Sequence, residues 1–122
     1  MPKITSGNIE KRRSEIQYLG YQFKDFLKDL LNERNMNQRD LSIVTRNTTK
    51  TISEWATGLS VPSHANFQNI INSIAPTHDQ TVRQNYINEK TATYISIRRS
   101  YDEARKLMRE RKALNDQHQG GR

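Results

Sequence analysis

Apolar residues recur at helical spacing along the first third of the chain. Four of them stand seven residues apart: Ile9, Ile16, Phe23 and Leu30. A seven-residue repeat keeps apolar side chains on one face of a helix. The pattern therefore predicts a helix from about Asn8 into Asn32, with Asn8 as its N-cap and with a break near Gly20 as an alternative. The half from Tyr21 to Arg34 has the clearest amphipathic pattern and is expected to be the first helix of a compact domain.

Residues 37–62 predict two short helices joined by a tight turn. Asn37 is the expected N-cap of the first helix, whose Leu41 and Val44 should pack inward. In the second helix, Ile52 and Trp55 lie three residues apart and should be buried. The opposite face is polar: Thr49, Lys50, Ser53, Glu54 and Thr57. This pattern favours an exposed surface shaped to enter a groove.

After Gly58 the chain predicts a further helix, with Ser63 as its N-cap and Pro76 as its stop. Its buried face is expected to consist of Phe67, Ile70, Ile71 and Ile74.

Beyond Pro76 the pattern predicts a long amphipathic helix from about Thr93 to Asn115, and His78 and Asp79 offer a start for a short helix through Tyr86. The final residues, QHQGGR, are expected to form a disordered tail. The segment TATYISI at 91–97 is rich in β-branched and aromatic residues, so a strand that pairs with a second copy is a competing prediction.

The long C-terminal helix carries an apolar stripe that must pack against some surface. Its members recur at helical spacing: Tyr94, Ile97, Tyr101 and Met108. The stripe either contacts a second copy or another protein, or folds back onto the chain's own core, and the sequence leaves both arrangements open.

Length and composition limit the architecture. At 122 residues, 33% of them hydrophobic, the chain is about one domain long and can bury one modest core. Its apolar runs are too short for a membrane span or a signal peptide, which predicts a cytoplasmic, nucleoid-associated protein without membrane contact. Without cysteine, the chain can form neither disulfides nor thiolate zinc sites.

The net charge of +7 is concentrated in the two flanks of the chain. Residues 1–36 carry seven basic against five acidic side chains, residues 37–75 three against two, and residues 76–122 ten against six. Strong attraction to nucleic-acid phosphates would therefore come mainly from the flanks.

The sequence offers no arrangement typical of catalysis. His64, His78 and His118 lie in separate segments at spacings unlike those of a metal site. There is also no glycine-rich phosphate loop and no serine or carboxylate constellation. We therefore expect no catalytic residues, no metal site and no cofactor, and a protein that is not an enzyme.

Residues 38–62 resemble the helix-turn-helix of the Cro and phage-repressor family, also called the XRE family. The residues that carry the resemblance are Gln38, Leu41, Thr51, Ile52, Ser53, Trp55, Gly58 and Pro62. The resemblance covers about 55 of the 122 residues and implies an all-α, compact four- to five-helix domain. In that organisation, 1–20 is a basic N-terminal helical arm, 21–76 the helix-turn-helix domain, and 77–122 a C-terminal helical extension for dimerisation or partner contact.

The resemblance also implies which residues contact DNA. Those expected to reach base edges are Thr49, Lys50, Ser53 and Glu54. Those expected to contact phosphates are Gln38, Arg46, Thr48, Thr51, Ser60 and Ser63. The chain departs from the family at the turn, where Arg46 stands in place of the usual glycine. Because asparagine tolerates the left-handed conformation better than arginine, the first short helix is expected to extend through Arg46, with Asn47 left-handed.

The function implied is that of a sequence-specific regulator of transcription, of prokaryotic or phage type, that binds an inverted repeat in double-stranded DNA as a homodimer. Two alternatives remain. One is an antitoxin-like autorepressor whose residues 77–122 bind a partner protein, and the other is a nucleoid-type protein that binds DNA without sequence preference. The operator sequence, any inducer, and the choice between activation and repression are left open.

Overall fold

The computed structural model describes the backbone of residues 6–120 and the side chains of residues 13–110. Over this range the chain forms five helices and no strand, which confirms the all-α prediction. They are α1 (Ser6–Glu33), α2 (Gln38–Thr45), α3 (Thr49–Ala56), α4 (His64–Ile74) and α5 (Gln80–Gly120).

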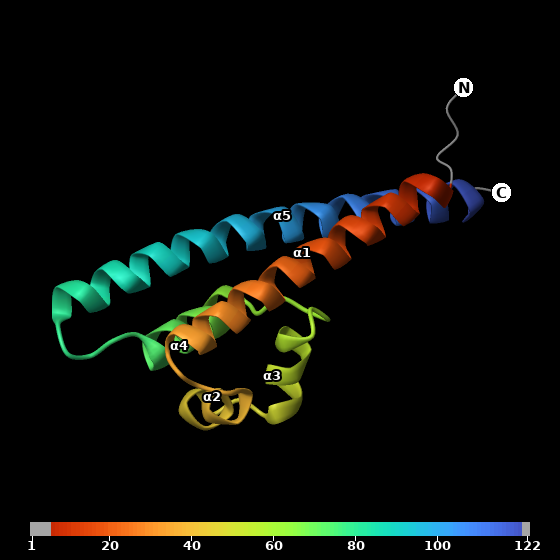
Figure 1. The fold of residues 1–122 in the computed structure, drawn as a ribbon. Helices are drawn as coiled ribbons and strands as arrows, with labels where there is room; N and C mark the ends of the chain where they lie inside the picture. The colour runs from red at the N-terminus through yellow and green to blue at the C-terminus, as the bar shows by residue number, and fades with distance from the viewer. Residues whose placement is uncertain (1–5, 121–122) are drawn as a thin grey trace.

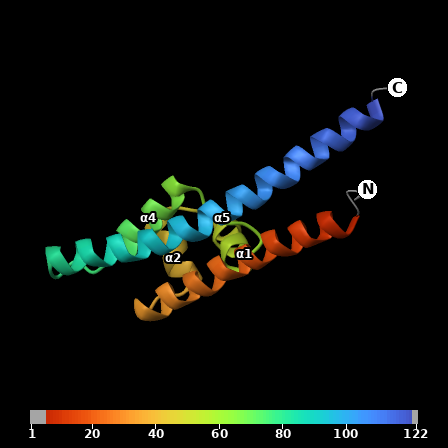
Figure 2. The same ribbon diagram turned by 90° about the horizontal axis from the view of Figure 1, so that it is seen from above.

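The two long helices, α1 and α5, run antiparallel and form one layer, and the three short helices form a second layer against it (Figure 1). Seen from above, the N-terminal part of α1 and the C-terminal part of α5 extend past the short helices and diverge (Figure 2). α3 packs against α1 and α2, whereas α4 packs against α2 and α5. The three short helices therefore all lie on one side of the antiparallel pair formed by α1 and α5.

α1 is one continuous helix of 28 residues, so the alternative of a break near Gly20 is wrong. It begins at Ser6, which places Asn8 inside its first turn and not at the N-cap. Gly20 is buried in the interior of the helix, where α1 passes close to the backbone of Gly58. The glycine is thus explained by this close approach and not by a helix end.

α5 replaces the two helices expected after Pro76 with a single one of 41 residues. The strand prediction for 91–97 is wrong, because packing on α1 and α4 selects a helix despite the β-branched composition. The helix continues through Gly120, so residues 117–120 of the expected disordered tail are helical. Residues 121–122 lie outside the described part of the chain.

The centre of the core is a cluster of three aromatic rings from α1, α4 and α5. Phe67 and Tyr94 are stacked with ring centroids 4.1 Å apart. Phe23 meets both rings edge-on, at 6.3 Å from Phe67 and 6.2 Å from Tyr94. Since Tyr94 is fully buried, α5 belongs to the core of the fold. Of the two arrangements that the sequence left open, the apolar stripe of α5 therefore adopts the one in which it packs onto the chain's own core.

The turn between α2 and α3 differs from the prediction. Arg46, with φ 59°, is the left-handed residue, so α2 ends at Thr45 and the assignment of this conformation to Asn47 is wrong. The side-chain amide of Asn69 in α4 donates to the carbonyl of Thr45 at 2.8 Å. The hydroxyl of Ser42 donates to the carbonyl of Asn47 at 2.7 Å. These contacts fix the turn one residue earlier than local preference suggests.

The inward face of α2 is also shifted. Leu41 is fully buried as expected, but Val44 is 44% exposed, which contradicts its predicted inward position. Thr45 is buried in its place, and its hydroxyl donates to the carbonyl of Leu41 at 2.7 Å. This bond within the helix satisfies the hydroxyl, so threonine can occupy the core position without leaving an unpaired polar group.

Candidate nucleic-acid interface

α3 begins and ends through local interactions. Thr48 is its N-cap, and the Thr48 hydroxyl accepts a hydrogen bond from the Thr51 amide at 3.2 Å. At the other end, the Thr57 amide donates to the carbonyl of Ser53 at 2.9 Å. Gly58 then turns the chain away with φ 80°, a conformation that favours glycine. These caps limit α3 to eight residues.

α3 is held in the fold by two apolar residues on one face. Ile52 is 0% exposed and Trp55 is 3% exposed, as predicted. On the opposite face, Thr49, Lys50 and Ser53 are exposed. The buried pair therefore fixes the rotation of the helix about its axis, so that these polar side chains face outward.

Glu54 occupies a less open position than the other predicted base-contacting residues, because it is half-buried. Its main-chain carbonyl accepts hydrogen bonds from the amides of Leu59, at 2.9 Å, and Ser60, at 3.3 Å. Glu54 thus also helps to close the loop that follows α3.

The exposed face of α3 and the first residues of α2 line a common groove of about 520 Å³. Its lining consists of Gln38, Arg39, Thr49, Lys50 and Ser53. The groove brings together three of the four residues predicted to contact bases and one predicted to contact phosphate.

The start of α2 is fixed by a capping box. The Asn37 side chain accepts from the Asp40 amide at 2.8 Å, and the Asp40 carboxylate accepts from the Asn37 amide at 3.0 Å. Gln38 and Arg39 follow directly as the first two residues of the helix, and both are exposed. Sequence analysis did not single out Arg39. The expected cap at Asn37 was a signal that could have found it, because the cap places the next two residues on the first turn.

The remaining residues predicted to contact phosphate lie outside this groove. Arg46 is exposed at the turn between α2 and α3. Thr48 caps α3, and its hydroxyl lies 3.0 Å from that of Thr51. Ser60 is half-buried, whereas Ser63 is exposed and caps α4 by accepting from the Asn66 amide at 3.2 Å.

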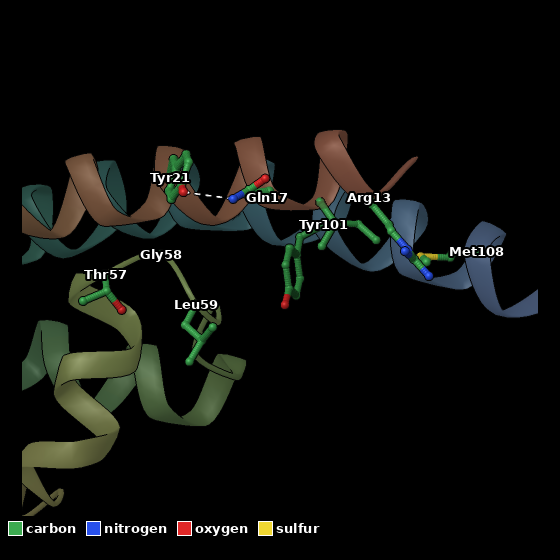
Figure 3. A pocket seen from close by; sticks show the side chains of 9 residues that line it. Arg13, Gln17, Tyr21, Thr57, Gly58, Leu59, Tyr101 and Met108 are labelled. Atoms are coloured by element: carbon green, nitrogen blue, oxygen red, sulfur yellow. Dashed lines mark hydrogen bonds between the residues drawn. The ribbon is translucent and has the colours of Figure 1, made fainter. Parts of the chain in front are cut away.

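The four residues proposed for partner contact are divided between the core and a second hollow. Tyr94 is fully buried and Tyr101 is 6% exposed, so neither offers an accessible surface to a partner. Ile97 and Met108 are half-buried. Tyr101 and Met108 from α5 meet Arg13, Gln17 and Tyr21 from α1 around a hollow of about 560 Å³, closed on one side by residues 57–59 (Figure 3).

The charged and titratable groups of the described side chains do not form a metal-binding cluster. Within residues 13–110, no three His, Cys, Asp or Glu residues come together in a suitable group. None of the described helices has an apolar stretch that could cross a membrane. The charged side chains that line the groove, Arg39 and Lys50, are both basic.

Comparisons with protein-family models, with curated proteins and with solved structures find no match for this chain.

Proposed function

We propose that the chain is a sequence-specific, double-stranded DNA-binding regulator of transcription in which α2 and α3 act as a helix-turn-helix. The observation that carries the proposal is the groove shared by these two helices, in which Gln38, Arg39 and Lys50 lie beside the small polar residues Thr49 and Ser53. Such a surface combines hydrogen-bond donors for base edges with donors for phosphates.

The dimensions of α3 suit the major groove of B-DNA. An eight-residue helix is about 12 Å long, and the major groove is about 12 Å wide. Thr49 and Ser53 have short side chains, so bases could approach close to the helix backbone. The burial of Ile52 and Trp55 in the core supports this role because it fixes the position of α3. Base discrimination needs the exposed side chains of the helix at fixed positions.

Each exposed side chain of α3 has a chemically defined role in the proposal. Lys50 donates to O6 and N7 of a guanine, and the methyl group of Thr49 packs on the methyl group of a thymine. Ser53 can donate to a base or accept from it. Glu54, being half-buried, has less freedom to reach the amino group of a cytosine.

Phosphate contacts would orient α3 in the groove. Gln38 and Arg39 at the start of α2 and Arg46 at the turn provide amide and guanidinium donors, which commonly bind phosphate oxygens. Further donors are the hydroxyl groups of Thr51 within α3, of the two N-caps Thr48 and Ser63, and of Ser60 in the loop between α3 and α4. These contacts carry no sequence information themselves, but they fix the position of Lys50 relative to the bases.

The proposal includes a homodimer on an inverted repeat. One short helix covers only a few base pairs, whereas two copies with their α3 helices about 34 Å apart contact successive turns of the major groove. The buried positions of Tyr94 and Tyr101 mean that the dimer contact must use other residues than these two.

The two alternatives make different predictions. An antitoxin-like protein would have a C-terminal region that becomes ordered on its partner. Here α5 is helical from Gln80 to Gly120 and contributes Tyr94 to the chain's own core, which does not favour this alternative. A nucleoid-type protein would bind operator and random DNA equally well.

The decisive experiment is the selection of bound fragments from random duplex DNA with the full chain. We expect an enriched motif with two-fold symmetry and half-sites about 34 Å apart. Binding without any enriched motif would replace this function by non-specific DNA binding, and the absence of binding at low salt would reject both.

A further inference from the structure

α5 holds the loop that follows α3 by hydrogen bonds to two consecutive carbonyl groups. The Tyr94 hydroxyl donates to the carbonyl of Pro62 at 2.6 Å, in a buried bond. The Arg98 guanidinium donates to the carbonyl of Val61 at 2.8 Å and to that of Pro62 at 3.1 Å. Two side chains, one turn apart on α5, therefore fix the backbone at 61–62.

Arg98 is itself held in place by its own helix. Its Nε atom donates to one oxygen of the Asp102 carboxylate at 3.1 Å, and its Nη2 atom lies 3.0 Å from the other oxygen. The guanidinium also lies over the ring of Tyr101, 5.5 Å from its centroid. A planar guanidinium fixed at two points directs its remaining N–H groups in set directions.

Fixing the Pro62 carbonyl also fixes the amide of Ser63. The peptide bond is planar and trans, so the carbonyl of one residue and the amide of the next point in opposite directions. Because the Pro62 carbonyl points toward Tyr94 and Arg98, the Ser63 N–H points away from α5. Ser63 is exposed and lies between the loop and the start of α4.

We infer that Tyr94 and Arg98 are positioning residues that orient the Ser63 end of the loop toward the DNA backbone. This inference depends on the proposed function, in which Ser60 and Ser63 contact phosphates. In this arrangement α5 influences DNA binding through the loop, without contacting the DNA itself. A displacement of α5 would release the loop and weaken phosphate binding, while α3 would keep its position.

The test compares three variants of the full chain. Tyr94→Phe removes one hydroxyl and keeps the stacked ring, and Arg98→Gln removes the guanidinium that contacts both carbonyls. Arg99→Gln is the matched control, because it removes the same charge from the adjacent, exposed position. Amide chemical shifts of Ser63 and Lys50 are followed during titration with the selected duplex, or with a random duplex if no motif is enriched, at a temperature where all variants are folded.

In the wild-type protein and in Arg99→Gln, DNA should shift the amide signals of both Ser63 and Lys50. In Tyr94→Phe and Arg98→Gln, the Ser63 signal should lose its response while the Lys50 signal keeps it, and affinity should fall about tenfold relative to the control. A purely structural role would leave both responses as in the wild-type protein, because all variants are folded at the chosen temperature.

Two results would overturn the inference and leave the proposed function intact, provided that the Lys50 amide responds normally. In the first, the Ser63 amide of the wild-type protein does not respond to DNA. In the second, it responds equally in all variants. If the Lys50 amide does not respond in the wild-type protein, the proposed function itself fails, and the inference falls with it. Should Arg98→Gln not fold, Tyr94→Phe alone decides between these outcomes.

Discussion

Gly20 in α1 lies directly against the main-chain carbonyl of Gly58, in the turn that follows α3. A Cβ atom on Gly20 would overlap that carbonyl oxygen, which belongs to the backbone and has no rotamer to change. A Cβ atom on Gly58 would in turn come within 2.6 Å of Cδ1 of Tyr21. The end of α3 is thus set by a close backbone contact with α1.

Gly20→Ala should destabilise the fold even though alanine favours helix by about 1 kcal/mol over glycine. The added methyl group forces α1 and the Gly58 turn apart, and overpacking of this kind costs about 1 to 3 kcal/mol. The free energy of unfolding is measured by urea denaturation. Ser14→Ala, on the exposed side of the same helix, is the control and should change it by about 0.5 kcal/mol or less. A Gly20→Ala variant that gains the full helix preference of alanine, about 1 kcal/mol over the wild type, would mean that the two backbones are not in contact.

The caps and buried positions that the sequence predicted correctly depend on residues that are close to one another in the sequence. Asn37 and Ser63 cap their helices as expected, because each cap is made within three residues of the chain. The burial of Ile52 and Trp55 follows from helical spacing in the same way. These local rules were sufficient to place the exposed face of α3.

The features that sequence missed depend on distant segments. The end of α2 is fixed by Asn69 of α4, 24 residues away, which no local preference at Arg46 and Asn47 could reveal. The close contact of Gly20 with Gly58 likewise joins positions 38 residues apart, so the sequence alone leaves a helix break near Gly20 as an alternative. In the candidate site, the cap at Asn37 places Arg39 on the first turn of α2, but its place in the groove also depends on how α2 lies beside α3.

Arg46 has a left-handed backbone, with φ 59°, which costs a residue with a side chain about 1 to 2 kcal/mol relative to the ordinary helical conformation. Glycine adopts this conformation freely, so Arg46→Gly should raise the free energy of unfolding by about 1 kcal/mol. Arg46→Asn removes the same charge and should give a smaller gain, which separates the backbone effect from the electrostatic one. Urea denaturation measures both. Equal stability of all three proteins would contradict the left-handed assignment.

Lys50→Ala should weaken binding to the selected DNA motif by about 1 to 3 kcal/mol and relax the preference at one base position. The reason is that the lysine donates to base acceptors in the major groove in the proposed complex. Lys106→Ala removes the same charge from an exposed site on α5 and should leave the base preference unchanged. Mobility-shift titrations on the motif and on single-base variants measure the effect. Equal weakening on every sequence would make Lys50 a phosphate contact.

Burial raises the pKa of the Tyr94 hydroxyl from 10.0 to about 12, with Arg98 lowering it and Asp102 raising it to smaller extents. Because the folded protein favours the protonated hydroxyl, this contribution to stability is complete below pH 10 and is lost as the pH rises from 10 to about 12. The free energy of unfolding should therefore fall over this interval, and it should fall less steeply in Tyr94→Phe, which has no hydroxyl to titrate. Tyr18→Phe, which removes a hydroxyl from a side chain that is 60% exposed, is the matched control. Tyr86, whose pKa burial also raises to about 12, continues to contribute in both variants, so the slope of Tyr94→Phe should not reach zero. A Tyr94→Phe slope equal to that of the wild type would contradict the burial of the Tyr94 hydroxyl.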